Sequence, residues 1–421
     1  MTLRTQRIGV SAVFVIHGAV QGTFATRIPA IAEHLHLSPG VLGAALFAPS
    51  LGSLALMPFT GRLIHRFGGR RSTNVLLSLW CAALVLPAIA PSLLTLWLAL
   101  FVFGASAGMA DVAMNAQGVA LDEAMGKSVM SSLHGMWSVG GFAAAGVGAL
   151  AAHGNVGVEA HFIAVAIVLL VLAQFACRLL PASPSDVPDA IFAVTDEPKP
   201  PRFAFPTGAI LVIALVAFCA VFAEVAGSDW AAVYLRRVLG AGHATAALGY
   251  TMFALTMAIC RLTGDRVVRR FGPVGTVRAS AIIGTLGAVL VVVAVNTVVT
   301  IVGFGLIGIG VAVVVPLGFA AAGRIAKAQT ATGTGAAAAS ARTGNAIAGV
   351  ATIAYGAGLA APGVIGGIAS LASLRISFIV VAALVATVAV FAGVIGGGTR
   401  NGASPTGDAA AAELEIAATA G

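Results

Sequence analysis

Apolar stretches long enough to cross a membrane recur along the whole chain, and they constrain its fold more than any other feature. A helix needs about 20 mainly apolar residues to span a bilayer, where every backbone polar group must be satisfied within the protein. Twelve stretches meet this requirement: residues 8–28, 40–60, 73–91, 93–118, 132–152, 160–180, 207–228, 244–263, 275–295, 297–321, 344–368 and 375–396. The sequence therefore predicts an all-α membrane protein with twelve transmembrane helices.

The composition agrees with this class, because charged residues are scarce. Only 9% of the 421 residues are Asp, Glu, Lys or Arg, and 59% are hydrophobic. A soluble domain carries about 25% charged residues. So few charges cannot cover a water-facing surface, which argues against a soluble enzyme, a disordered chain or a fibrous protein. The four cysteines lie far apart inside apolar stretches, so neither a disulfide framework nor a metal site is predicted.

Basic residues sort to one side of the predicted membrane. If both termini are cytoplasmic, nineteen of the 23 Lys and Arg residues fall in cytoplasmic segments and only Arg27, Arg236, Arg237 and Arg375 fall outside. Basic residues favour cytoplasmic loops because they resist translocation. The net charge of +8 is therefore attributed to membrane topology and not to nucleic-acid binding. We expect a multi-pass protein of the cytoplasmic membrane, whose partner is the lipid bilayer and not a nucleic acid.

The predicted spans divide into two groups of six. A segment rich in Pro, Ser, Asp, Glu and Lys separates them. The predicted organisation is thus an N-terminal six-helix bundle at 1–180, a cytoplasmic linker at 181–206 and a C-terminal six-helix bundle at 207–396. The Gly/Ala-rich tail at 397–421 has little to bury and is predicted to be a disordered cytoplasmic tail.

A similar loop stands between the second and third spans of each half. The first copy reads GRLIHRFGGRR from Gly61 to Arg71, and the second reads RLTGDRVVRRFGP from Arg261 to Pro273. In each copy a glycine is followed by cations and by the sequence Arg-Phe-Gly. Such a loop is suited to a tight turn supplied by glycine, with basic groups that can meet the ends of neighbouring helices. Two copies in register favour an internal repeat over an ordinary positive loop.

This loop resembles the signature of the major facilitator superfamily, Gly-x-x-x-Asp-Arg/Lys-x-Gly-Arg/Lys-Arg/Lys. The chain departs from the signature at His65, which replaces the acid, and at Gly69, which is an extra residue before Arg70. Segments 111–118 and 130–138 are similar to the MosC-like branch of this family, to which sugar and polyol permeases are more distantly related. The resemblance implies two pseudo-symmetric bundles that give alternating access to a central site, in a protein that acts as a monomer.

The resemblance also implies functional regions. The first, fourth, seventh and tenth spans are expected to line the central cavity, and the repeated loops are expected to close its cytoplasmic side. The implied cytoplasmic gate consists of Gly61, Arg62, His65, Arg66, Gly68, Arg70 and Arg71 in the first copy, and Gly264, Asp265, Arg266, Arg269, Arg270 and Gly272 in the second.

Polar side chains inside the spans are candidates for the substrate pathway, because burying them in a membrane is costly. His17 and Gln21 are four residues apart on one face of the first span, and Gly18 and Gly22 beside them allow a partner helix to approach closely. Glu224 in the seventh span is expected to face them across the cavity. An acid opposite a histidine and an amide suits a hydroxyl-rich or cationic solute. The alternative for His17 and Gln21 is a pair of interhelical hydrogen bonds in a packed seam.

In the fourth span, Asp111 and Asn115 are again four residues apart. Keeping a carboxylate ionised away from water is costly, so Asp111 is the first candidate for a residue that binds and releases a coupling proton. The alternative is a permanent structural pair with Arg62 or His134.

Aromatic residues near the spans are assigned to simpler roles. Trp230 and Tyr234 are predicted to belong to the aromatic belt at the membrane surface, with Asp229 close to them near the outer side. Trp137 is predicted to serve packing.

These features predict a secondary active transporter of a small solute, either polyol- or sugar-like or an amine. A proton gradient or another ion gradient would drive it, and no cofactor is predicted. Two alternatives stay open: an exporter of amphiphilic drugs, and a membrane sensor that does not transport. The chain has no HExxH arrangement, so an enzyme is not expected.

Overall fold

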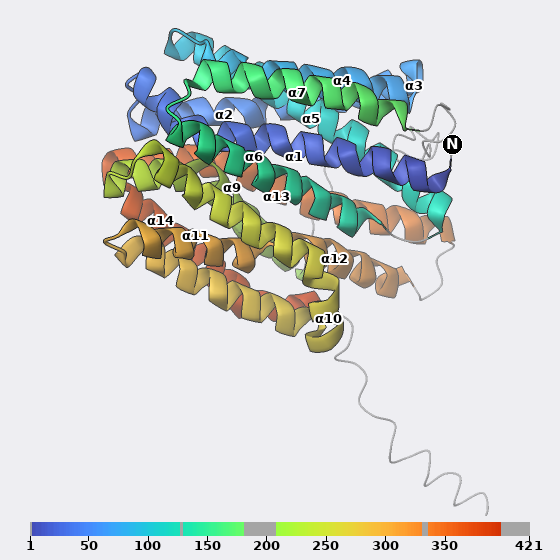
Figure 1. Ribbon diagram of the computed structural model, residues 1–421. Coiled ribbons are helices and arrows are strands. Elements are labelled where there is room, and N and C mark those ends of the chain that lie inside the picture. Colours follow the sequence, from blue (N-terminus) through green and yellow to red (C-terminus); the bar gives the residue numbers. More distant parts are fainter. Residues whose placement is uncertain (1, 127–128, 181–207, 331–335, 397–421) are drawn as a thin grey trace, which may run out of the picture.

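The computed structural model describes residues 2–126, 129–180, 208–330 and 336–396 (Figure 1). Over these ranges the chain forms helices joined by short connections, and no strand occurs in them. The prediction of an all-α protein is confirmed. The predicted linker at 181–206 and the predicted tail at 397–421 lie outside the described residues.

The N-terminal half contains α1 (Leu3–His34), α2 (Pro39–Leu56), α3 (Thr60–Phe67), α4 (Gly69–Ala83), α5 (Leu93–Met125), α6 (Met130–His153) and α7 (Val158–Arg178). The C-terminal half contains α9 (Gly208–Leu239), α10 (His243–Val293), α11 (Thr297–Val311), α12 (Val314–Thr330), α13 (Ala336–Leu371) and α14 (Leu374–Phe391). Short 3-10 turns continue α2 and α14 at Met57–Phe59 and Ala392–Gly396. Several helices pack against partners that are distant in sequence, such as α1 with α6, α2 with α5 and α4 with α7.

Eleven helical segments in the described ranges are long and apolar enough to cross a membrane. One of them, α10, has 51 residues. At 1.5 Å per residue it would be about 76 Å long, more than twice the thickness of a hydrocarbon core. Its backbone is interrupted at Gly272, where φ is 72° and ψ is 163°, and the helix turns back there. Because α10 supplies two spans, the eleven segments amount to the twelve predicted spans.

The two repeated loops share one backbone geometry. Gly68 separates α3 from α4 with φ 80° and ψ 152°, nearly the same values as Gly272 in α10. Positive φ is accessible to glycine because it has no Cβ atom. The turn is therefore at the second glycine of each copy. Gly61 and Gly264 lie inside helices, since the helix continues through the cations that follow them.

Close helix contacts at glycine hold the N-terminal half together. A Cβ atom added to Gly18 would lie 2.0 Å from the carbonyl oxygen of Trp137, and one added to Gly22 would lie 2.2 Å from that of Gly141. Both contacts join α1 to α6. The predicted close approach of a partner helix at Gly18 and Gly22 is confirmed.

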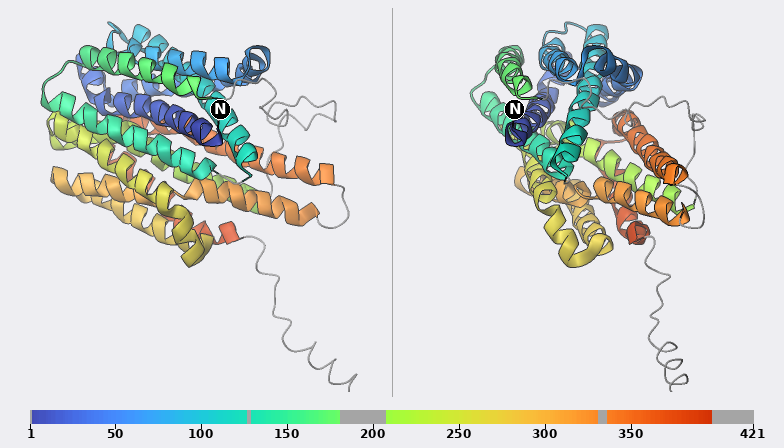
Figure 2. Two further views of the ribbon diagram at one scale, coloured as in Figure 1. Left: turned by 45° about the vertical axis from the view of Figure 1, so that its right-hand side comes forward. Right: turned by 90° about the vertical axis from the view of Figure 1, so that its right-hand side faces the viewer.

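The two ends of the bundle differ in charge. The beginning of α1, helix α3 and the turn of α10 lie at the same end (Figures 1 and 2). We call this the basic end, and it carries Arg62, Arg66, Arg70, Arg266 and Arg270. We call the opposite end, where α1 ends and α10 begins, the distal end.

The two halves pack closely towards the distal end. There α2 of the N-terminal half contacts α13 of the C-terminal half. A Cβ atom added to Gly43 would lie 2.5 Å from the carbonyl oxygen of Pro362, and one added to Gly366 would lie 2.7 Å from that of Pro39. Backbones approach this closely only where side chains are absent.

Candidate functional site

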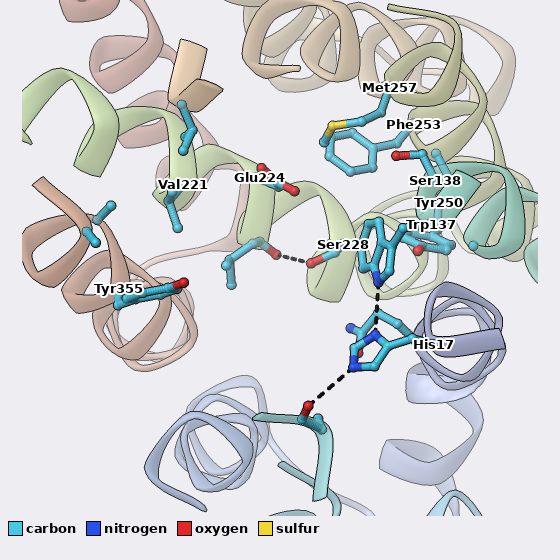
Figure 3. A pocket seen from close by; sticks show the side chains of 18 of the residues that line it. His17, Trp137, Ser138, Val221, Glu224, Ser228, Tyr250, Phe253, Met257 and Tyr355 are labelled. Atoms are coloured by element: carbon cyan, nitrogen blue, oxygen red, sulfur yellow. Dashed lines mark hydrogen bonds between the residues drawn. The ribbon is translucent and has the colours of Figure 1, made fainter. Parts of the chain in front are cut away.

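A central cavity of about 370 Å³ lies between the two halves (Figure 3). Helices α1, α4, α5 and α6 form its wall on one side, and α9, α10, α12 and α13 form the other. The predicted cavity residues His17, Gln21 and Glu224 all line it. Its wall is otherwise largely aromatic and apolar, with Trp80, Trp137, Tyr250, Phe253, Met257, Phe319 and Tyr355 among its residues.

His17 is fixed by hydrogen bonds to both of its ring nitrogens (Figure 3). Trp137 Nε1 donates to His17 Nδ1 at 3.0 Å, and His17 Nε2 lies 3.2 Å from the carbonyl oxygen of Ala107. An indole N–H only donates and a carbonyl only accepts, so Nδ1 is unprotonated and Nε2 carries the hydrogen. His17 is therefore neutral. His17 lines the cavity, and its hydrogen bonds also join α1 to α5 and α6. The position at the cavity and the role in interhelical hydrogen bonding therefore apply to this residue at the same time.

Trp137 packs against the core, as predicted, and it also lines the central cavity. Its ring lines the cavity and its N–H orients His17. Sequence alone did not show which face of α6 points to the cavity. Trp137 and Ser138 lie four and three residues before Gly141, which contacts α1. This spacing puts all three on one helix face, at the α1 interface.

Glu224 forms an ion pair with a residue that the sequence interpretation assigned to a cytoplasmic segment. Arg261 Nη2 lies 2.9 Å from Glu224 Oε1, and Arg261 Nη1 donates to Ser138 Oγ at 3.2 Å. The guanidinium also lies 5.8 Å from the centre of the Trp137 ring, which suits a cation–π contact. Arg261 thus links α9 and α10 to α6 of the other half. The assignment was wrong because Arg261 falls within α10, inside the predicted span 244–263, and an arginine there was itself a signal.

The structure places Asp111 and Asn115 beside the central cavity, and neither is one of the residues that line it. Asn115 Nδ2 donates to the backbone carbonyl of Asp111 at 2.9 Å. The Asp111 carboxylate interacts electrostatically with His134 on α6 and with Tyr355, which does line the cavity. The predicted alternative partner Arg62 lies instead over the Phe59 ring, 5.7 Å from its centre. Within the described ranges no ion pair is formed by Asp111.

A second cavity of about 200 Å³ adjoins the central one towards the distal end, and we call it the side chamber. The two cavities share Gln21, Trp80, Ala107, Val225 and Ser228 in their walls. The remaining residues of the side chamber are Phe24, Leu46, Pro49, Ser50, Ser53, Phe103, Gly104, Asp229 and Gly358.

Asp229 lies in this chamber. The sequence interpretation had placed it near the outer surface instead. Ser228 Oγ donates to Asp229 Oδ1 at 3.0 Å. The aromatic-belt prediction for Trp230 and Tyr234 is also wrong, because both side chains are fully buried and Tyr234 Oη donates to the carbonyl of Val291 at 2.7 Å. The reason is the length of α9, which continues to Leu239 and so carries this segment well inside the protein.

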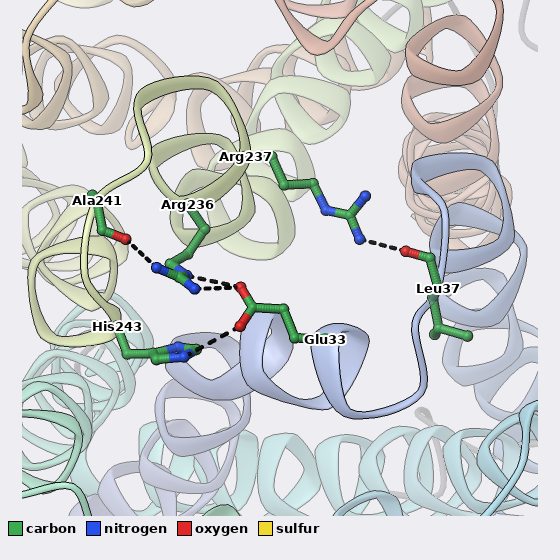
Figure 4. Close-up of polar contacts among 6 residues, drawn as sticks. All are labelled: Glu33, Leu37, Arg236, Arg237, Ala241 and His243. Atoms are coloured by element: carbon green, nitrogen blue, oxygen red, sulfur yellow. Dashed lines mark hydrogen bonds and ion pairs between the residues drawn. The ribbon is translucent and has the colours of Figure 1, made fainter.

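Charged contacts close the distal end between the two halves (Figure 4). Arg236 Nε of α9 donates to Glu33 Oε1 of α1 at 2.8 Å, and Arg236 Nη2 forms an ion pair with the same oxygen at 2.8 Å. His243 of α10 lies 3.3 Å from Glu33 Oε2. Arg237 donates to the backbone carbonyl of Leu37. We call Glu33, Arg236 and His243 the distal lock.

The basic end carries no comparable link in the part of the chain that the structure describes. Arg66 and Arg270 each lie over the phenylalanine that follows them, at 5.4 and 5.6 Å from the ring centres. No ion pair joins the two halves there among these residues. Among the described residues, the ion pairs that join the two halves thus lie at the distal end, and Arg261 adds a hydrogen bond and a cation–π contact across the halves beside the cavity. The gate role of the repeated loops stays a prediction.

The fold and the site define a class: a multi-pass membrane protein with two helical halves around a shared central cavity. Comparison with known proteins gives the family. The family model of the Major Facilitator Superfamily matches residues 10–349, and the chain belongs to this family of transporters. The predicted family is confirmed.

Relatives and solved structures agree with this assignment. The chain is 34% identical over 389 residues to the uncharacterized transporter y4wD of Sinorhizobium fredii, covering 92% of this chain and 97% of the relative. It is 29% identical over 310 residues to the membrane protein MosC of Rhizobium meliloti, covering 73% of each chain. The crystal structure of the nucleoside transporter NupG superimposes with a TM-score of 0.66 over 94% of this chain and 100% of that chain, at 11% identity. The last likeness shows the fold alone.

Proposed function

We propose that this protein is a secondary active transporter that moves a small polar solute across the cytoplasmic membrane by alternating access. The observation that carries the proposal is the central cavity, whose walls come from both halves, while the ion pairs that join the two halves in the described part of the chain lie at the distal end. A rocking movement that opens the distal end and closes the basic end would expose the same cavity to the other side. One chain supplies both walls, so we propose a monomer.

The orientation follows from charge. Arginines gather at the basic end, and basic residues resist translocation. We therefore place the basic end and both termini in the cytoplasm. In this orientation the structure represents the conformation that is closed towards the outside.

The cavity favours a small solute with polar groups. Its volume of about 370 Å³ is at the low end of the roughly 300–1,000 Å³ typical of ligand pockets. Aromatic rings provide apolar contact area, and Gln21, Glu224 and Ser228 provide hydrogen-bonding groups. A polyol, a sugar-like molecule or an amine matches this mixture. Export of an amphiphile is the second candidate, because Phe253, Met257 and Phe319 form an apolar wall.

We propose that a proton gradient drives transport, with Asp111 as the coupling residue. Its support is the position of the carboxylate beside the cavity, next to His134 and Tyr355, without an arginine or lysine partner among the described residues. The Asp111 carboxylate can bind and release a proton without a large movement of the protein.

Uptake into proteoliposomes tests the proposal. Labelled hexoses, polyols and amino sugars are offered with and without a pH gradient, and with a protonophore. We expect one of these classes to accumulate only while the gradient is present. Glu224→Gln should reduce this uptake, whereas Glu159→Gln, the same change at an exposed acid on α7, should not. Binding of a solute without translocation would instead support a sensor, and accumulation that ignores the protonophore would contradict proton coupling.

A further inference from the structure

The carboxylates that line the two connected cavities outnumber their positive partners. Glu224 and Asp229, five residues apart on α9, are the two acids in these walls. Glu224 is paired with Arg261, and His17 is neutral by its hydrogen bonds. No lysine, arginine or histidine in the described ranges forms an ion pair with Asp229. In its ionised form Asp229 is therefore without a positive partner, and a charge inside a membrane protein is costly unless it is matched.

The three serine hydroxyls around Asp229, those of Ser50, Ser53 and Ser228, are arranged as hydrogen-bond acceptors. Ser53 Oγ donates its hydrogen to the carbonyl of Gly104 at 2.6 Å, and Ser50 Oγ donates to that of Gly358 at 3.1 Å. Ser228 donates to Asp229 itself. The hydroxyl hydrogens are thus engaged, which leaves the serine oxygens and the carboxylate as acceptors, while the amide of Gln21 in the same wall offers both donors and an acceptor. A group with several N–H donors and no acceptor, such as an ammonium, complements this lining.

The chamber has room for a small organic group. A proton needs no cavity, and the side chamber has about 200 Å³. Trp80 and Phe103 lie in its wall, and aromatic faces attract organic cations. Because Gln21 and Ser228 belong to both cavities, a ligand in the central cavity can extend one end into the chamber.

We infer that the side chamber is the subsite for a protonated amine of the ligand, with Asp229 as its counter-ion. This rests on the proposed function, in which the central cavity holds the solute. It narrows the solute class from hydroxyl-rich or amine to a solute that carries an amine. Asp229 is then the residue that selects the charge of the solute, while Glu224 is occupied by Arg261.

The charge of the chamber can be measured without a known solute. The four native cysteines are replaced by alanine, and Ser53→Cys introduces one thiol into the chamber wall. Its reaction rates are measured with three thiosulfonate reagents: cationic aminoethyl, neutral methyl and anionic sulfonatoethyl methanethiosulfonate. Ala351→Cys, which lies in the wall of the central cavity and not of the chamber, is the matched control.

We expect the ratio of cationic to neutral reaction rates to be about tenfold higher for Ser53→Cys than for Ala351→Cys, which corresponds to about 1.4 kcal/mol. Asp229→Asn in the Ser53→Cys background should remove this excess, and Asp229→Glu should keep it. The asparagine variant changes the charge and hardly the volume, and a thermal unfolding curve shows whether each variant is folded.

Two results would overturn the inference. If Ser53→Cys shows no cation preference, Asp229 is neutral and the chamber is not an amine subsite. If sodium chloride protects Ser53→Cys from the aminoethyl reagent in an Asp229-dependent way and potassium chloride does not, the chamber holds a metal cation. The labelling requires no transport, so the two proposals can fail separately. Gradient-driven uptake of a neutral solute without a cation preference in the chamber would uphold the proposed function and overturn the amine subsite. A cation preference without gradient-driven uptake would have the opposite meaning.

Discussion

Replacing Glu33 with glutamine removes the negative charge that joins the two halves at the distal end. Glu33 faces Arg236 and His243 from the other half, so the variant leaves two basic groups without their acid. The contacts exist only while the distal end is closed. The substitution should therefore destabilise the closed conformation and leave the open one almost unchanged.

The structure sets the size of this effect. Two unit charges 4 Å apart attract each other by about 4 kcal/mol near a protein surface, but measured exposed pairs contribute only about 0.2–1 kcal/mol. The side chains of Arg236 and Glu33 are 23% and 41% exposed, and a hydrogen bond together with a second close contact to the same oxygen fixes their geometry, so we take the upper end, about 1 kcal/mol. That energy changes the ratio of closed to open molecules about fivefold.

Distances between spin labels on the two halves measure this ratio. Glu159→Cys on α7 and Val295→Cys between α10 and α11 place labels at exposed distal positions in a background without native cysteines. In Glu33→Gln the short-distance population should fall about fivefold relative to the long-distance one. Glu123→Gln, at an exposed acid near the basic end, should leave the distribution as it is.

Two further variants separate charge from shape. Exchanging the charges with Glu33→Arg and Arg236→Glu together should restore much of the closed population. Partial burial and the charge of Arg236 lower the pKa of His243 in the closed conformation, so protonation of His243 at low pH should weaken the lock, and this effect should disappear as the pH rises. A distance distribution in Glu33→Gln that matches the parent at every pH would refute the role of the distal lock.

Three further outcomes test the site and the packing. Arg261→Gln and Glu224→Gln should each lower the free energy of unfolding by about 2 kcal/mol, because each leaves a partly buried charge unpaired. The double variant should recover most of this loss. Additive losses in thermal unfolding would contradict the pairing. Asp111→Asn should abolish the dependence of proteoliposome uptake on a pH gradient, and full retention would exclude this residue as the coupling site. Gly18→Val should lower the melting temperature of the purified protein, because an added Cβ would lie 2.0 Å from the Trp137 carbonyl oxygen and overpacking costs about 1–3 kcal/mol; an unchanged melting temperature would show that α1 and α6 can separate there.

The sequence was sufficient for the fold because a membrane leaves few choices. Apolar length sets the spans, and the repeated Arg-Phe-Gly sequence marked the turns at Gly68 and Gly272. The count of twelve holds although α10 is continuous by its hydrogen bonds, since a glycine with positive φ reverses the chain direction within it. These properties are local, and hydropathy and backbone conformation suffice to predict them.

The site was only partly predictable because it depends on which helix faces meet. Hydropathy placed His17, Gln21 and Glu224 in spans, and all three line the cavity. It could not show that Arg261 reaches Glu224, since this pairing depends on the rotation of α10 relative to α9. The burial of Trp230 was missed for the same kind of reason, because an aromatic residue near the end of a predicted span suits both a belt and a core.

The two halves contribute unequal chemistry to a pseudo-symmetric fold. The acids in the cavity walls, Glu224 and Asp229, both lie on α9, and Arg261 lies on the adjoining α10, whereas His17 and Trp137 of the N-terminal half are neutral and bonded to each other. If the halves rock as rigid bodies, Glu224, Asp229 and Arg261 keep their mutual distances throughout the cycle, while the contacts of Arg261 with α6 and those of the distal lock are broken and remade. Charge recognition should then be similar in both conformations. The contact of the solute with the neutral aromatic wall of the N-terminal half is what differs between the two conformations, and it therefore determines which of them a bound solute stabilises.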